Sequence, residues 1–183
     1  MNIYLTRHGL TEWNVTNKIQ GQTDTPLSED GKKQAEEARE YLKDTNIDVV
    51  ISSPLTRAVE TAKIITKGRN LEILTDERIK ERNFGALEGE QKLLLKQMLK
   101  EAFSFGGRTG VEGMEEFDDI YKRTKEFFEE IKEKYANKDV LIVFHAGNSI
   151  AARAYFEGYE NKEVKEELSS LRLKNCQILK YEI

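Results

Sequence analysis

The chain contains two histidines, His8 and His145, and each follows a segment that is typical of a β-strand. Arg7 stands directly before His8, and Arg57 follows another predicted strand. In open α/β sheets, ligands bind beyond the carboxyl ends of the strands, so we expect these four side chains at one edge. A guanidinium fork matches phosphate oxygens, and an imidazole can be the nucleophile in phosphoryl transfer. The four residues together predict a site for a dianionic phosphoryl group.

Such a site also needs an acid for the leaving group, and Glu81 is the candidate. It follows the third predicted strand closely enough to reach the same edge. The local sequence alone favours an exposed Glu81 paired with Lys80 or Arg82, because few glutamates are catalytic. A metal site is disfavoured, because the arginines would repel a cation and the chain has no third histidine.

The elements that must position these residues alternate between strands and helices. Apolar residues at helical spacing predict the helices, and continuous or β-branched apolar runs predict the strands. We expect strands at 2–6, 48–52, 71–74, 139–144 and within 171–183, and helices at 28–44, 55–65, 114–135 and 148–156. This alternation favours a layered α/β fold with a largely parallel sheet. Residues 88–113 begin helix-like and then become rich in glycine, which indicates an excursion from the core or a lid over the site.

Length and composition exclude several classes of protein. The chain has 183 residues, the size of one ordinary domain, and 29 Lys and Arg against 33 Asp and Glu give a net charge of −4. A mildly acidic chain is a poor nucleic-acid binder. The longest apolar run, Val140–Phe144, is far shorter than the roughly 20 residues of a membrane-spanning helix. The first residues lack the order of a signal peptide, so we expect a cytoplasmic protein with no membrane partner. Cys176 is the single cysteine, which excludes an intrachain disulfide.

Five separated blocks of the sequence carry a more specific pattern. They are Arg7-His8-Gly9 with Thr11-Glu12-Trp13-Asn14, Gln20-Gly21 with Asp24-Thr25-Pro26-Leu27-Ser28, Ser52-Ser53-Pro54-Leu55-Thr56-Arg57, Glu81 to Gly85 with Leu87-Glu88-Gly89, and His145 after an apolar strand. In these blocks the chain resembles the phosphatase branch of the histidine phosphatase superfamily, which is the phosphoglycerate-mutase-like group. The resemblance covers nearly the whole chain, in the order of the family. It implies one domain over residues 1–183, a three-layer α/β/α fold with a mostly parallel sheet.

The resemblance also implies a two-step hydrolysis of a small phosphomonoester. His8 would attack phosphorus and become phosphohistidine, and Glu81 would protonate the leaving oxygen and then help water to attack. Arg7, Arg57 and His145 would hold the phosphoryl oxygens and stabilise their developing charge. The scheme requires no metal and no organic cofactor.

Three further residues, Asn14, Gln20 and Gly21, are expected to bind the substrate, with Asn14 donating a hydrogen bond to the phosphoryl group. The chain departs from the family pattern at Leu10, where many members carry a polar residue, and at Ala146, which stands directly after the second histidine. Leu10 would replace a polar contact by apolar packing near the substrate. The sequence leaves the oligomeric state open, with a homodimer as one option.

Two alternatives to hydrolysis remain open. A cofactor-dependent phosphoglycerate mutase shares this core but carries a longer central insertion with basic residues for the substrate carboxylate. Residues 88–113 are compact and contain no adjacent pair of arginines, so the sequence favours hydrolysis. A non-catalytic phosphate-ligand binding protein would be expected to lack His8 or Glu81, and both are present.

Overall fold

In the computed structural model of the chain, which describes residues 1–95, 105–159 and 168–183, the strands form one five-stranded sheet. Their order across the sheet is β3-β2-β4-β1-β5. The strands are β1 (Asn2–Arg7), β2 (Val49–Ser52), β3 (Ile73–Thr75), β4 (Val140–Phe144) and β5 (Ile178–Glu182). The first four run parallel, and β5 pairs antiparallel with β1 at one edge. The mostly parallel sheet expected from the sequence is confirmed.

The central strand β4 is buried along its whole length, as its continuous apolar run predicts. Alternate side chains point to opposite faces of a strand. Val140, Ile142 and Phe144 accordingly pack into one hydrophobic cluster, and Leu141 and Val143 pack into another on the opposite face. Both faces of the sheet must therefore be covered by other elements.

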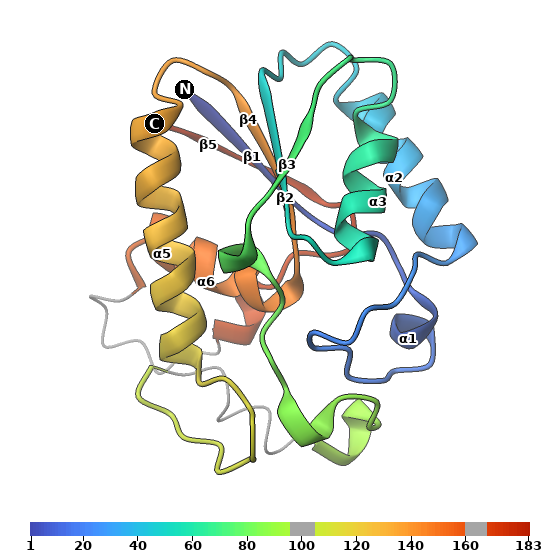
Figure 1. The fold of residues 1–183 in the computed structure, drawn as a ribbon, viewed down its shortest axis with the longest axis vertical. Helices are drawn as coiled ribbons and strands as arrows, with labels where there is room; N and C mark the ends of the chain where they lie inside the picture. Colours follow the sequence, from blue (N-terminus) through green and yellow to red (C-terminus); the bar gives the residue numbers. More distant parts are fainter. Residues whose placement is uncertain (96–104, 160–167) are drawn as a thin grey trace.

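Helices cover the two faces in pairs. On one face lie α2 (Glu29–Tyr41) and α3 (Thr56–Ile65), and on the other lie α5 (Phe117–Lys134) and α6 (Ala146–Phe156). Figure 1 shows the sheet between these two pairs. Ser28 caps α2 by accepting a hydrogen bond from Gly31 N, as its position before an acidic first turn predicts. The predicted three-layer α/β/α arrangement is confirmed.

The structure corrects several predicted boundaries by a few residues. The third strand is β3 at Ile73–Thr75 rather than 71–74, and α5 begins at Phe117 rather than at residue 114. The helix expected from residue 148 begins at Ala146. A short helix that was not predicted, α1 (Glu12–Val15), is capped by Thr11.

Residues 88–113 are only partly described, because 96–104 lie outside the described residues, as do Met98 and Leu99 of the helix-like start. The described part of that start is a 3-10 helix, η3 (Lys92–Leu95), with Leu93 79% exposed rather than packed. Residues 89–92 lie antiparallel to 17–19, because Gly89 N donates to Ile19 O at 2.8 Å and Ile19 N donates to Glu90 O at 2.9 Å. The lid expected from the sequence stays a prediction.

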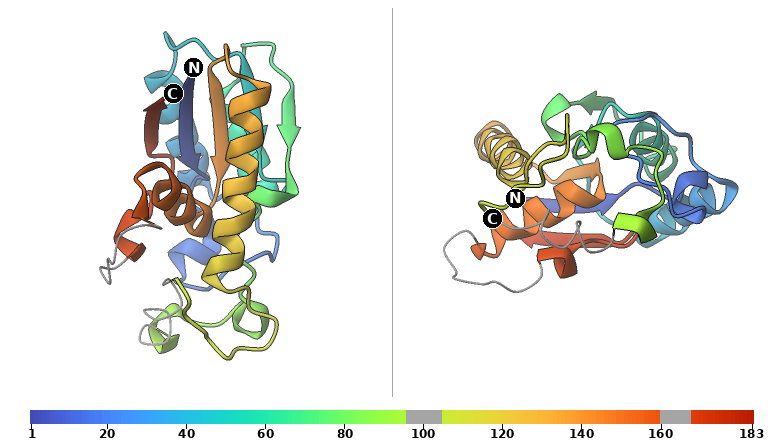
Figure 2. Two further views of the ribbon diagram at one scale, coloured as in Figure 1. Left: turned by 90° about the vertical axis from the view of Figure 1, so that its left-hand side faces the viewer. Right: turned by 90° about the horizontal axis from the view of Figure 1, so that it is seen from below.

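The candidate site was expected at the end of the sheet where the parallel strands finish. The register places Arg7 opposite Phe144 and Ser52 opposite Val143, so β1, β2 and β4 end level with one another. Figures 1 and 2 show α1 and the segments around residues 80–95 and 105–117 gathered at this end, opposite both chain termini. The residues that follow the three strands therefore meet in one place.

Candidate active site

His8 follows β1 and is held in one orientation and one protonation pattern. Its backbone N–H donates to Phe144 O at 3.0 Å, and its ring Nδ1 lies 2.7 Å from Gly9 O. A carbonyl oxygen only accepts hydrogen bonds, so Nδ1 carries the proton and Nε2 has a free lone pair. Burial lowers the pKa of His8 well below its usual value, and the charges of Arg57 and Arg7 lower it further. The ring is therefore a neutral imidazole with a free nucleophilic nitrogen.

Arg57 lies in the first turn of α3 and its side chain is fully buried. Its Nη2 donates to Gly21 O at 2.7 Å and its Nη1 donates to Thr23 O at 3.0 Å, while Nε is buried without a hydrogen-bond partner in the described structure. Burial lowers the pKa of Arg57, and the nearby carboxylates of Glu81, Asp24 and Glu88 partly offset this by raising it. A buried guanidinium that is bound mainly by carbonyl oxygens favours an anion beside it.

The loop at residues 21–23, whose carbonyl oxygens accept hydrogen bonds from Arg57, is held in place by Glu88. The Glu88 carboxylate accepts hydrogen bonds from Gln22 N at 2.9 Å, Thr23 N at 2.8 Å and Thr23 Oγ1 at 2.6 Å. Gly21 has a φ of 53°, and a Cβ there would lie 1.9 Å from Glu88 Oε1. Only glycine therefore lets this loop curl tightly around the carboxylate.

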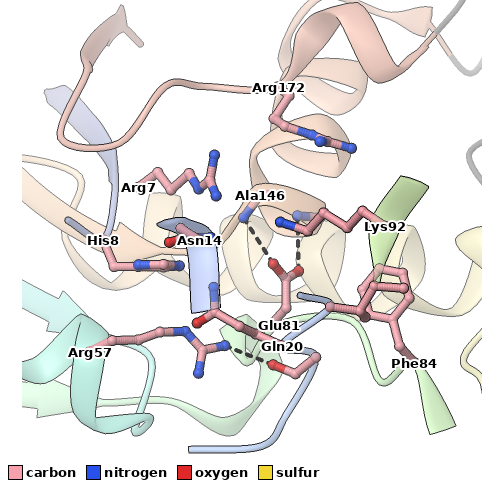
Figure 3. A pocket seen from close by; sticks show the side chains of 13 residues that line it. Arg7, His8, Asn14, Gln20, Arg57, Glu81, Phe84, Lys92, Ala146 and Arg172 are labelled. Atoms are coloured by element: carbon pink, nitrogen blue, oxygen red, sulfur yellow. Dashed lines mark hydrogen bonds between the residues drawn. The ribbon is translucent and has the colours of Figure 1, made fainter. Parts of the chain in front are cut away.

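Arg7 ends β1, and its Nη1 donates to Leu173 O at 3.3 Å. Burial lowers the pKa of Arg7 to about 10. The charge of Glu81 partly offsets this lowering, and the positive charges of the nearby Arg172 and Arg57 add to it. At neutral pH the guanidinium thus stays charged. Figure 3 shows Arg7 and Arg57 on two sides of the space between His8 and Glu81.

Glu81 reaches the site because it binds the N-terminus of α6. Its Oε1 accepts hydrogen bonds from Arg82 N at 2.8 Å and Gly147 N at 2.9 Å, and its Oε2 accepts from Ala146 N at 3.1 Å. A Cβ on Gly147 would lie 2.6 Å from Oε1, so the close approach requires glycine at that position. Glu81 is only 7% exposed.

The exposed pairing that the local sequence favoured for Glu81 is therefore wrong. Lys80 pairs instead with Glu77, with 2.7 Å between Nζ and Oε2. Arg82 Nε donates to Glu115 O at 2.6 Å. The placement at the sheet edge, which the family resemblance implied, is the one observed.

His145 follows β4 and lies against His8, with 5.1 Å between the ring centroids. It is fully buried and does not form part of the cavity wall. Its Nε2 lies 2.7 Å from Ser53 Oγ, and its Nδ1 is buried without a hydrogen-bond partner in the described residues. Burial lowers the pKa of His145 well below its usual value, and the positive charges of Arg57 and Arg7 add to this. Its place next to His8 was expected, but its place behind the wall was not.

The cavity at this edge has a volume of about 70 Å³. The predicted site residues on its wall are Arg7, His8, Asn14, Gln20, Gly21, Arg57 and Glu81, with Ala146 beside them. Asn14 uses its Oδ1 to accept hydrogen bonds from the backbone and hydroxyl of Thr11, both at 3.2 Å, which leaves its amide hydrogens for a ligand. Gln20 Oε1 accepts from Thr25 Oγ1 at 2.7 Å. Leu10, expected to pack near the substrate, is not on the wall.

Other wall residues escaped the sequence reasoning: Phe84, Lys92 and Arg172. Lys92 lies in the excursion at residues 88–113, and nothing in its local sequence marks it as part of a site. Arg172 precedes β5, which is antiparallel, so the start of that strand lies at the edge where the parallel strands end. Recognising the direction of the last strand would have placed Arg172 here.

Two searches of the described residues are negative. No group of three His, Cys, Asp or Glu side chains in the described part is placed to hold a metal ion. Within the same ranges, no helix is both long and apolar enough to cross a membrane.

The fold and this cluster define an enzyme of the phosphatase class built on the phosphoglycerate-mutase fold. The chain belongs to the histidine phosphatase superfamily (branch 1), whose family model matches residues 3–183. The expected family and fold are thereby confirmed.

Individual relatives agree with this assignment. The chain is 35% identical over 174 residues to a Bacillus subtilis (strain 168) protein named Uncharacterized phosphatase PhoE, covering 95% of this chain and 84% of that protein. It is 35% identical over 153 residues to Phosphoserine phosphatase 1 of Hydrogenobacter thermophilus, covering 79% of this chain and 71% of that protein. The solved structure of Bacillus stearothermophilus YhfR superposes with a TM-score of 0.86 at 28% identity, over all of this chain and 91% of the other.

Proposed function

We propose that this chain hydrolyses a small phosphorylated metabolite through a phosphohistidine intermediate on His8. One observation carries the proposal: the unprotonated Nε2 of His8 and the Glu81 carboxyl share a small cavity with the guanidinium groups of Arg7 and Arg57. A nucleophile, an acid and two fixed cations are the groups that phosphoryl transfer requires. The relatives named as phosphatases support hydrolysis as the outcome.

In the first step, Nε2 of His8 attacks phosphorus and the bond from phosphorus to the ester oxygen breaks. Protonated Glu81 transfers its proton to the leaving oxygen, which departs as a neutral alcohol. The Nδ1 proton stays on the hydrogen bond to Gly9 O throughout. Arg7 and Arg57 hold the phosphoryl oxygens and stabilise the charge that builds on them.

In the second step, water attacks the phosphorus of phosphohistidine and Glu81 accepts a proton from it. The bond from Nε2 to phosphorus then breaks, which releases inorganic phosphate and restores neutral His8 with protonated Glu81. Every atom and proton is accounted for without a metal or organic cofactor.

The remaining site residues support these steps. Burial and the neighbouring arginines lower the pKa of His145 in the ligand-free protein, and the negative charge of a bound dianion acts in the opposite direction and raises it. Asn14 donates from its free amide to a phosphoryl oxygen, and Gln20 and Gly21 form the wall beside it. We further propose that the substrate is a free small molecule in the cytoplasm; the acidic net charge of −4 disfavours nucleic acid as the substrate.

A chemical trap tests the proposal. The protein is mixed with a phosphomonoester labelled in its phosphoryl group and quenched within milliseconds in base, in which phosphohistidine survives. We expect the label on the peptide containing His8, and none in the His8→Ala variant. Absence of label with a broad panel of phosphomonoesters would contradict the enzymatic proposal and favour a phosphate-ligand binder. Transfer of the label to a phosphoglycerate that depends on a bisphosphoglycerate primer would favour a mutase.

A further inference from the structure

Glu81 is presented by a stretch of chain that has no regular secondary structure of its own. The stretch lies between two short 3-10 helices, η1 (Glu77–Ile79) and η2 (Gly85–Leu87). Figure 1 shows η1 beside α5, and these two elements are in contact. Because neither a helix nor a strand ladder pairs this backbone, other groups must bind it to keep Glu81 in one place. Those groups come from α5 and from the residues just before it.

One guanidinium on α5, that of Arg123, binds three backbone carbonyl oxygens of this region. Its Nη1 donates to Arg78 O at 2.5 Å and to Lys80 O at 2.7 Å. Its Nη2 donates to Glu81 O at 3.2 Å. The backbone that leads into Glu81, and that of Glu81 itself, is thereby fixed to α5.

The same guanidinium is paired with the carboxylate of Glu115. The distance from Arg123 Nε to Glu115 Oε1 is 2.6 Å and that from Nη2 to Oε2 is 2.9 Å, the two parallel contacts of a bidentate pair. A guanidinium has five N–H donors, so the carboxylate and the three carbonyl oxygens occupy all of them. Arg123 is not on the cavity wall. It therefore acts on the site through the backbone that it holds rather than by touching a substrate.

Glu115 extends this clamp to the residues that follow Glu81. Its Oε2 accepts a hydrogen bond from Asn83 N at 3.2 Å, and its backbone N–H donates to Asn83 O at 2.9 Å. Its carbonyl oxygen accepts from Arg82 Nε at 2.6 Å. The backbone is thus held on both sides of Glu81, at the point from which its carboxyl reaches the N-terminus of α6.

We propose that Arg123 is a positioning residue for the general acid: it holds the backbone of residues 78–81 so that the Glu81 carboxyl lies against the N-terminus of α6, within reach of the leaving oxygen. An acid must lie within hydrogen-bond distance of the oxygen that it protonates, and a displacement of about 1 Å can cost about a hundredfold in rate. Lysine cannot take over this role, because an ammonium has three donors and no planar fork. This inference rests on the proposed hydrolase function.

The dependence of the rate on the leaving group tests the inference. Glycerol 3-phosphate releases an alkyl oxygen that needs a proton, whereas p-nitrophenyl phosphate releases a stable anion that does not. We expect Arg123→Met to slow formation of phosphohistidine by about tenfold or more with glycerol 3-phosphate, and by less than about threefold with p-nitrophenyl phosphate. Competitive inhibition by inorganic phosphate should stay nearly unchanged, because no phosphate-binding side chain is altered.

Arg123→Lys separates the shape of this side chain from its charge, and it also serves if Arg123→Met fails to fold. After burial and the charges of Arg57 and Arg7, the charge of Arg123 also lowers the pKa of His145, and lysine keeps that charge. Arg123→Lys should still slow glycerol 3-phosphate selectively, by about threefold or more. In a Glu81→Gln background, which has no acid to position, it should cause no further loss. A full additional loss in that background would overturn the inference.

Arg78→Met is the matched control, because the Arg78 side chain joins the same region to α5. Its Nη1 lies 2.8 Å from Glu130 Oε2 and its Nη2 lies 2.7 Å from Asp76 Oδ2. Within the described residues, its guanidinium forms no hydrogen bond with Glu81. Arg78→Met should leave the ratio of the two rates unchanged. Equal slowing of both substrates by Arg123→Met, or the same fall of the ratio in Arg78→Met, would overturn the inference and leave hydrolysis intact.

Hydrogen exchange separates this inference from the proposed function. The backbone N–H groups of Ala146 and Gly147 donate to the Glu81 carboxyl, and their exchange with solvent needs no turnover. We expect both to exchange about tenfold faster in Arg123→Lys and at the unmodified rate in Arg78→Met. Unchanged exchange in Arg123→Lys would overturn the positioning role whether or not the protein hydrolyses anything. Faster exchange, together with no phosphohistidine in the trap for the unmodified protein, would overturn only the proposed hydrolysis.

Discussion

Replacing Glu81 with glutamine should separate the chemistry of the site from its packing. Glutamine has nearly the same shape, and its one oxygen can still accept from Arg82 N and Gly147 N, which lie 2.8 and 2.9 Å from Oε1. Its amide nitrogen would take the place of Oε2 and face Ala146 N, another donor. One N–H near α6 then has no acceptor, which costs about 1–3 kcal/mol of unfolding free energy.

The kinetic effect should be larger and should depend on the leaving group. Loss of a general acid typically lowers a rate by about 10²–10⁴-fold, or about 3–5 kcal/mol at 1.36 kcal/mol per factor of ten. An alkyl oxygen leaves poorly without a proton, whereas p-nitrophenolate leaves as a stable anion. Glu81→Gln should therefore slow formation of phosphohistidine at least a hundredfold with an alkyl phosphate, and less than tenfold with p-nitrophenyl phosphate.

Rapid-quench kinetics measure this step directly for both substrates. With p-nitrophenyl phosphate, Glu81→Gln should give a burst of p-nitrophenol followed by a slow steady state, because hydrolysis of phosphohistidine has lost its base. Glu88→Gln is the matched control, since Glu88 is a neighbouring carboxylate that accepts several hydrogen bonds and lies off the wall. Equal slowing of both substrates by Glu81→Gln would refute its assignment as the acid and indicate a packing role.

Two further predictions concern stability. In urea unfolding, Thr61→Val should cost about 1–3 kcal/mol more of unfolding free energy than Thr66→Val. Both hydroxyls donate to a backbone carbonyl of α3, but only Thr61 Oγ1 also accepts a hydrogen bond from Gly9 N, at 3.0 Å. Equal costs would contradict a structural role for that bond. The second prediction concerns pH. Both His8 and His145 have lowered pKa values in the folded protein and stay unprotonated there, so the unfolded chain binds more protons in acid. The unfolding free energy should therefore fall as the pH drops below about 6.5, by about 1.4 kcal/mol per pH unit for each histidine. Urea unfolding between pH 7 and pH 5 measures this dependence of unfolding free energy on pH, which should be about half as steep in His145→Gln. An NMR titration of the folded protein that gives the His8 ring a pKa at or above 6.5 would contradict the lowered pKa of His8.

The order of the elements was predictable because their signals are local. The apolar run of β4 and the cap at Ser28 each lie within a few residues of the element they define. The weakest prediction was the third strand. Its observed form, β3, is a short strand at the edge of the sheet with mostly exposed side chains, so little burial patterns its sequence.

The junctions of strand and helix gave the core of the candidate site. Residues after β1, β2 and β4 were predicted to meet because parallel strands finish at one edge, and the level register of the three strands bears this out. Glu81 behaved differently, because its local sequence resembles that of any exposed glutamate between two basic residues. Its true partners are backbone N–H groups of α6, 65 and 66 residues further along the chain.

The sequence by itself therefore determined the family, the layered fold and the strand ends at which the candidate site lies, because each of these is indicated by short stretches of neighbouring residues. The tertiary structure decided what depends on contacts between distant segments. It set the tautomer of His8 through Gly9 O, turned Glu81 inward on the N-terminus of α6, and placed His145 behind the wall. It also brought Lys92 and Arg172 to the mouth of the same cavity. Such placements follow from pairing and strand direction, which no local pattern specifies.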